Sequence, residues 1–229
     1  MANSDFLRHN INQHTIKNSK SKKMDKEIIQ ATNAVIKTLE ENHPKLQFSH
    51  RKTMKANEII ELLSAKYPAY ENDYGRAYES SFISPDGGFL FAKDTETGKE
   101  EIVLVSEVKR QGTNDARLEE GLGIQAKGNA IERLGKNLIG IRAIFKDDDL
   151  IPFVVFGHGY DFQEGSTILD RVLTMNEFFP LNKEFVKKDY LPFEPVTMLF
   201  RQEIWTVDEM IEHLLSVAEK AIEIYFPGK

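Results

Sequence analysis

The sequence predicts an α/β fold, because strands and a helix succeed one another in its centre. The apolar run Gly88–Ala92 and the valine-rich run Ile102–Lys109 flank the polar stretch Thr95–Lys99. This arrangement predicts a hairpin of two strands. A helix from Asn129 follows, and the apolar run Ile151–Phe156 fits a strand that is buried on both faces. Because strand, helix and strand in succession make a parallel crossover, we expect helices packed on a sheet.

Further elements are expected on both sides of this centre. Apolar residues recur at helical spacing over Lys26–Glu41, and Ala56–Ala65 indicates a second helix. The central helix from Asn129 carries one apolar stripe, made of Ile131, Leu134, Leu138, Ile141 and Phe145. A strand over Val196–Phe200 and a terminal helix over Val207–Ile224 complete the predicted order.

Composition favours one domain in a reducing compartment. The chain has 229 residues, of which 41% are hydrophobic, enough for one sizeable core. It has no cysteine, which excludes disulfides and thiolate zinc sites, so the cytoplasm is the expected location and a metal must use carboxylates or histidines. The longest apolar runs are only strand-length, and the N-terminus lacks a secretory pattern, so no membrane partner is expected.

Charge divides the chain into a tail and a domain. Phe6–Met24 contains basic but no acidic residues, so residues 1–24 are predicted to be a flexible basic tail and residues 25–229 a single domain. The tail either has no function or helps to attract phosphates. The net charge of −6 argues against indiscriminate nucleic-acid binding, but a specific binder needs only a local basic surface.

One constellation of charged residues stands out around the predicted hairpin. The turn Ser84–Gly88 contains Asp86 and leads into the first strand, and the second strand contains Glu107 and Lys109. Alternate side chains of a strand share a face, so Glu107 and Lys109 project together. Asp86 can reach the same end of the hairpin, and two carboxylates with open positions suit magnesium.

These residue types match the needs of phosphodiester hydrolysis. A magnesium ion held by Asp86 and Glu107 would polarise the phosphate and activate a water molecule. Lys109 would position the attacking hydroxide and offset the growing negative charge. Each piece alone has a simpler explanation: Pro-Asp-Gly-Gly as a turn, and Glu-Val-Lys as an ion pair on a strand.

The order of these residues resembles the PD...(D/E)xK nuclease pattern, and in particular the EcoRI family of type II restriction endonucleases. Three stretches carry the likeness: the turn over residues 84–88, the strand over 103–112 and the segment Gly-Asn-Ala-Ile-Glu-Arg over 128–133. The last is the most specific, since such a run rarely occurs by chance at this place after the strand.

The resemblance implies a restriction-endonuclease-like core, with a mixed central β-sheet flanked by α-helices. It implies a homodimer that uses Mg²⁺ to cut both strands of double-stranded DNA at a palindrome with a central AATT, leaving 5′-phosphate ends. Asp86, Glu107 and Lys109 would be the catalytic residues. Asp86 and Glu107 would bind the metal, with the carbonyl of Val108 as a further ligand.

The resemblance also implies a DNA-reading segment. Asn129 and Arg133 would read the inner adenines and neighbouring bases in the major groove. Glu132 would orient these groups by pairing with Arg133 across the dimer. Gly128 and Ala130 would allow close approach of the backbone and contact with a thymine methyl group.

Two departures from the family pattern concern the flanking bases. Lys127 replaces a small residue, and its cation would contact a guanine or a phosphate. Arg171 belongs to a second recognition stretch, but Ile168 stands where that stretch has another arginine. The sites GAATTC, CAATTG and bare AATT therefore all stay open.

Two alternative functions remain at this point. A repair or junction-resolving nuclease of the same pattern would need Asp86, Glu107 and Lys109 but no base-reading residues. A DNA-binding protein that is sequence-specific but does not cut would have no use for an acidic centre. Dependence of cleavage on sequence distinguishes the three functions.

Overall fold

The strands predicted in the centre of the chain form part of a five-stranded sheet in a computed structural model, which describes residues 3–111, 121, 130–162, 165–185 and 195–229. The sheet has the order β1-β4-β5-β6-β7. Its strands are β1 (Leu46–Arg51), β4 (Gly88–Asp94), β5 (Glu100–Arg110), β6 (Phe153–His158) and β7 (Thr197–Arg201). Pairing is antiparallel from β1 to β5 and parallel from β5 to β7, so the sheet is mixed. The predicted α/β class, a mixed central sheet flanked by helices, is confirmed.

The predicted crossover is present, and α4 is the helix of it that lies within the described residues. α4 (Ala130–Ile144) lies between β5 and β6 in the chain, and β5 and β6 pair in parallel. Its buried residues are Ile131, Leu134, Leu138, Ile141 and Ile144, which follow the helical period expected of one packed face. α4 therefore lies directly on the sheet, next to the strand that carries Glu107.

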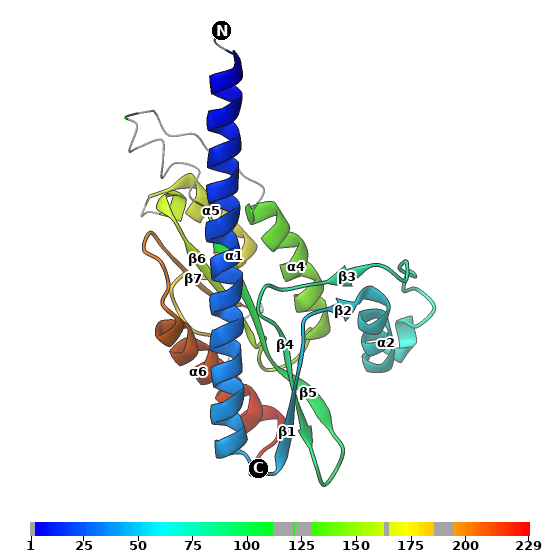
Figure 1. The fold of residues 1–229 in the computed structure, drawn as a ribbon. Helices are drawn as coiled ribbons and strands as arrows, with labels where there is room; N and C mark the ends of the chain where they lie inside the picture. Colours follow the sequence, from blue (N-terminus) through cyan, green and yellow to red (C-terminus); the bar gives the residue numbers. More distant parts are fainter. Residues whose placement is uncertain (1–2, 112–120, 122–129, 163–164, 186–194) are drawn as a thin grey trace.

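Helices cover both faces of the sheet, and each face has its own apolar core (Figure 1). α1 (Asn3–Asn42) and α6 (Val207–Tyr225) pack on one face, where Ile28 and Leu214 are fully buried. α4, α5 (Thr167–Met175) and α2 (Ala56–Lys66) contribute to the core on the other face. The side chains of each central strand thus alternate between two cores.

Residues 3–24 are helical, in the stretch that the sequence predicts to be a flexible basic tail. α1 begins at Asn3, and Figure 1 shows its N-terminal part extending past the sheet. A polar stretch gives no apolar period by which a helix can be recognised, although it can extend a helix that already exists. Met24 is the first buried side chain among those that are described. The boundary between a tail and a domain at residue 24 stays a prediction.

Several short elements carry no signal that the sequence analysis could use. β1 was not expected, because only Leu46 of its six residues is buried. β2 (Met54–Lys55) and β3 (Phe82–Ile83) form a separate two-stranded sheet. The 3-10 helices are η1 (Pro68–Tyr70) and η2 (Tyr160–Phe162). None of the helices within the described ranges combines the length and apolar character needed to cross a bilayer.

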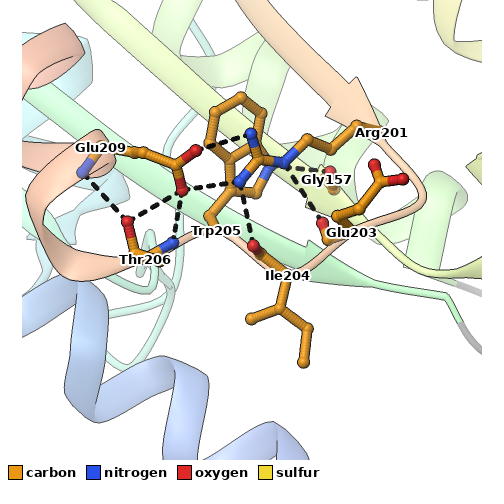
Figure 2. Close-up of polar contacts among 7 residues, drawn as sticks. All are labelled: Gly157, Arg201, Glu203, Ile204, Trp205, Thr206 and Glu209. Carbon is orange, nitrogen blue, oxygen red and sulfur yellow. Dashed lines mark hydrogen bonds and ion pairs between the residues drawn. The ribbon is translucent and has the colours of Figure 1, made fainter.

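A polar cluster fixes the connection between β7 and α6 (Figure 2). The guanidinium of Arg201 lies 3.7 Å from the centre of the Trp205 ring and bonds both carboxylate oxygens of Glu209. Glu209 in turn accepts the backbone N–H of Thr206 at 2.8 Å, and the Thr206 side chain caps the helix. The indole N–H of Trp205 donates to the Gly157 carbonyl at 2.9 Å, which ties the cluster to β6.

Candidate functional site

Backbone hydrogen bonds fix the turn before β4 against β5. The Gly87 N–H donates to the Ser106 carbonyl at 2.9 Å, and the Gly88 N–H donates to the Pro85 carbonyl at 3.1 Å. Gly88 has a φ of 77°, which favours glycine at this position. A Cβ on Gly87 would lie only 2.0 Å from the Ser106 hydroxyl oxygen. The two glycines therefore allow the turn to lie tightly on the strand, with Asp86 beside it.

The three predicted catalytic residues come together at this point. The Lys109 ammonium lies 2.8 Å from Oδ2 of Asp86 and forms an ion pair with Oε1 of Glu107. Oε2 of Glu107 accepts the backbone N–H of Asp86 at 3.1 Å. As the alternation of a strand requires, Ser106 points to the opposite side, where its hydroxyl lies 3.3 Å from that of Thr32 on α1.

Burial shapes the electrostatics of this group. The Glu107 side chain has no exposed surface, whereas Lys109 is 13% and Asp86 28% exposed. Burial raises the pKa of Glu107, the Lys109 ammonium opposes that rise, and the nearby Asp86 carboxylate adds to it. For Lys109 burial acts to lower the pKa, but the carboxylates of Glu107 and Asp86 outweigh it and raise the pKa. Lys109 is therefore a protonated cation between two acidic groups.

Three oxygen atoms converge on the Lys109 ammonium, and their chemistry fits a hard divalent cation. They are Oδ2 of Asp86, Oε1 of Glu107 and the carbonyl oxygen of Val108, the last at 3.1 Å. Carboxylate and carbonyl oxygens with room for water are the ligands that Mg²⁺ takes. In the described part of the chain, no three His, Cys, Asp or Glu side chains cluster as a metal site would need. A metal here would thus depend on a backbone carbonyl, water or substrate oxygen besides the two carboxylates.

Two further side chains contact this group, and the sequence analysis missed both. Nδ2 of Asn137 on α4 donates to Oε1 of Glu107 at 3.1 Å. Nε2 of His50 on β1 lies 2.8 Å from the Gly87 carbonyl oxygen. Asn137 does leave a trace in the sequence: it lies three residues after Leu134 and four before Ile141, so it is a polar residue within the apolar stripe of α4. His50 leaves none, because its strand was not expected.

Asp25 on α1 is a third residue near this group. It is half-buried, and burial raises the pKa of its carboxyl. The nearby Asp86 carboxylate raises that pKa further, and Lys109 acts against this effect. Asp25 therefore adds to the negative potential around the turn.

The structure describes only some of the residues predicted to bind DNA. Lys127, Gly128 and Asn129 lie outside the described residues. Ala130 is the first residue of α4, and Glu132 and Arg133 follow as exposed residues of its first turn. Arg133 precedes Asn137 by four residues, about one helical turn, so the two lie on neighbouring parts of one face.

Arg171 is exposed on α5, the helix that packs beside the N-terminal half of α4 (Figure 1). Met175 is one turn further along α5, and its Cε lies 3.1 Å from the position that a Cβ on Gly135 would take. The absence of a side chain at Gly135 thus lets α4 and α5, the helices that carry Arg133 and Arg171, approach closely.

Comparisons with known proteins agree with the predicted family. The model of the family described as restriction endonuclease EcoRI matches residues 11–226. The type II restriction enzyme RsrI of Cereibacter sphaeroides is 27% identical over 242 residues, which cover 89% of this chain and 85% of that protein. The type II restriction enzyme EcoRI of Escherichia coli is 33% identical over 152 residues, which cover 62% of this chain and 53% of that protein. The family match includes the turn, strand and helix described above.

Proposed function

The chain belongs to the EcoRI restriction endonuclease family, and on that premise we propose that it cuts both strands of a palindromic DNA site with a central AATT. As a member of this family it is a type II site-specific deoxyribonuclease. The proposal adds the identity of the site, Mg²⁺ as the divalent metal, and product ends that carry 5′-phosphates. One observation carries it: oxygens of Asp86, Glu107 and Val108 meet at the ammonium of Lys109.

The proposed catalytic residues have separate roles. Asp86, Glu107 and the Val108 carbonyl hold the metal, which when bound polarises the phosphodiester and lowers the pKa of a bound water. Glu107 is held by donors on both of its oxygens and is fully buried, so its carboxylate is oriented before substrate arrives. Lys109 presents a fixed positive charge that offsets the negative charge growing on the phosphate during attack.

Base reading is assigned to the N-terminal end of α4 and the segment before it. Asn129 pairs with the N6 and N7 edge of adenine, and Arg133 contacts adjacent bases. Glu132 orients these side chains, while Gly128 and Ala130 leave room for the backbone beside a thymine methyl group. The exposure of Glu132 and Arg133 in the first turn of α4 supports this assignment.

Lys127 and Arg171 are assigned to the flanks of the site. Arg171 is exposed on the helix that packs on α4, which agrees with a contact beyond the central base pairs. Because Lys127 replaces a small residue of the family pattern and Ile168 replaces an arginine, GAATTC, CAATTG and AATT are all candidate sites.

The proposed active form is a homodimer in the cytoplasm. A palindrome presents two identical half-sites, and two-fold symmetry of the protein places one active site on each strand. The cytoplasm is where such an enzyme meets incoming DNA, and a chain without cysteine is suited to a reducing environment.

Purified protein incubated with plasmid DNA and Mg²⁺ tests the proposal, with EDTA and Lys109→Ala as controls and with the fragment ends sequenced. Discrete, metal-dependent fragments with AATT at their ends are the expected result, and the ends identify the flanking base pairs. Cuts without sequence preference would instead indicate a repair or junction nuclease. Specific DNA binding without cleavage by folded protein would indicate a binder that does not cut.

A further inference from the structure

We propose that Asn137 is a positioning residue: its amide holds the Glu107 carboxylate from α4 and so links the DNA-reading helix to the catalytic strand. The inference rests on the proposed function, because it assigns Glu107 to the metal and α4 to DNA. It concerns a residue that acts through Glu107 and that was not singled out by the sequence.

The contacts of Glu107 show why Asn137 is special among its partners. The ammonium of Lys109 comes from β5, the strand that carries Glu107 itself. The backbone N–H of Asp86 comes from the turn that is hydrogen-bonded to this strand. Among the described residues, Asn137 is the one hydrogen-bonding partner of Glu107 from another layer of the fold, at 3.1 Å from Oε1. A movement of α4 relative to β5 therefore changes this contact and leaves the other two in place.

The chemistry of the contact suits a metal ligand. A carboxylate offers about four lone-pair directions, two on each oxygen. Asn137 and the Asp86 N–H each occupy one of these, on different oxygens, and so fix the plane of the carboxylate. Lys109 takes the second direction on Oε1, and one direction on Oε2 stays open for a cation. An amide also carries no charge, so it orients Glu107 without competing with the metal.

The position of Asn137 on α4 gives this contact its link to DNA. Arg133 lies one turn before Asn137 on the same helix, and Leu134 and Leu138 on either side are buried against the sheet. A helix transmits a shift along its axis as a nearly rigid body, so a displacement that seats Arg133 on DNA also moves the Asn137 amide. The seating of α4 on DNA therefore acts on a contact that already orients Glu107.

Asn137→Leu tests the inference, because leucine keeps the branched shape and the number of heavy atoms of asparagine and removes the donor. Mn²⁺ binding is measured by electron paramagnetic resonance, together with the Mg²⁺ concentration that half-saturates cleavage and with DNA affinity in EDTA. Loss of a partner that orients a metal ligand lowers metal affinity by about 10–100-fold. We expect that loss for both metals, with DNA affinity in EDTA unchanged.

Two further variants make the result specific. Asn137→Gln keeps a donor on a longer side chain and is expected to recover part of the metal affinity. Asn42→Leu is the matched control. It removes a 2.8 Å hydrogen bond that the amide of Asn42, the last residue of α1, donates to Glu219. This variant should change none of the three measurements. Should Asn137→Leu fail to fold, Asn137→Ser removes the same contact with a smaller polar side chain.

Wild-type metal affinity in Asn137→Leu would overturn the inference, and so would a loss of DNA affinity in EDTA, which would make Asn137 a DNA contact. Failure of the proposed function is a separate result: wild-type protein would then not cut at AATT, while the Mn²⁺ comparison would still decide the role of Asn137.

Discussion

The ring of His50 holds the Gly87 carbonyl oxygen at 2.8 Å and thereby connects β1 to the turn that carries Asp86. A carbonyl oxygen can only accept, so Nε2 of His50 carries the proton in this contact. The edge strand of the sheet thus takes part in fixing the position of a proposed metal ligand.

His50→Ala is expected to slow cleavage by up to about 10-fold, since one neutral hydrogen bond contributes roughly 0.5–1.5 kcal/mol. Cleavage rates at saturating DNA, with thermal unfolding measured in parallel, check this expectation. His43→Ala is a matched control, because His43 bonds Glu219 and the Lys229 carbonyl far from the turn. Equal rates for both variants would show that the turn needs no support from β1.

Glu107→Gln is expected to abolish cleavage while leaving the melting temperature in EDTA unchanged or higher. Burial of a carboxylate opposes folding, and the neutral amide keeps one oxygen, which accepts from either the Asp86 N–H or the Asn137 amide. Lys109 keeps its 2.8 Å contact with Asp86. A variant that melts several degrees lower would show instead that the Glu107–Lys109 ion pair stabilises the fold.

Gly87→Ala is expected to lower stability by about 1–3 kcal/mol, the usual effect of overpacking. The added Cβ would lie 2.0 Å from the Ser106 Oγ and 2.9 Å from Cγ1 of Ile28, so the turn must shift. Adding Ser106→Ala removes the nearest atom and should restore part of the loss. Gly75→Ala, where a Cβ meets nothing within 4 Å, is the neutral comparison in chemical denaturation. If Ser106→Ala restored none of the lost stability, the clash with the Ser106 hydroxyl would not be the cause of the loss.

The stability of the protein in acid is expected to depend on Glu209. Hydrogen bonds from Arg201 and Thr206 lower its pKa from 4.5 to about 2. A folded-state pKa below the unfolded one gives stability that is complete above pH 4.5 and is lost as the pH falls toward 2. Glu209→Gln should therefore lose less stability than wild type between about pH 6 and about pH 3.5.

Urea unfolding across that pH range measures the effect. Glu212→Gln, at an exposed glutamate of the same helix, serves as the control and should follow wild type. If Glu209→Gln lost as much stability in acid as wild type, the contacts in Figure 2 would not persist in solution.

The elements that the sequence predicts correctly are those whose burial is regular. The hairpin of β4 and β5, the helix α4 and the strand β6 each carry a continuous apolar run or stripe, which fixes both their type and their position. β1 has one buried residue and α5 only nine residues in all, so neither has a pattern long enough to recognise.

The same distinction applies to the site. Asp86, Glu107 and Lys109 were found because a turn and the alternation of one strand bring them together within about two dozen residues of chain. Asn137 and His50 reach the site from another helix and another strand, through tertiary packing that no local pattern encodes. The sequence therefore predicts the proposed catalytic residues, while the groups that hold them in place required the structure.

The crossover made by α4 has a consequence for attempts to redesign the enzyme. α4 cannot be exchanged as an independent unit. Its ends are fixed because it connects β5 to β6, and its inner face is fixed by the contact with the Glu107 carboxylate. If α4 and Glu107 have the proposed roles, grafting the corresponding helix of another enzyme would change turnover along with base preference. New target sites are more accessible through the exposed residues of its first turn, with Asn137 and the buried stripe left as they are.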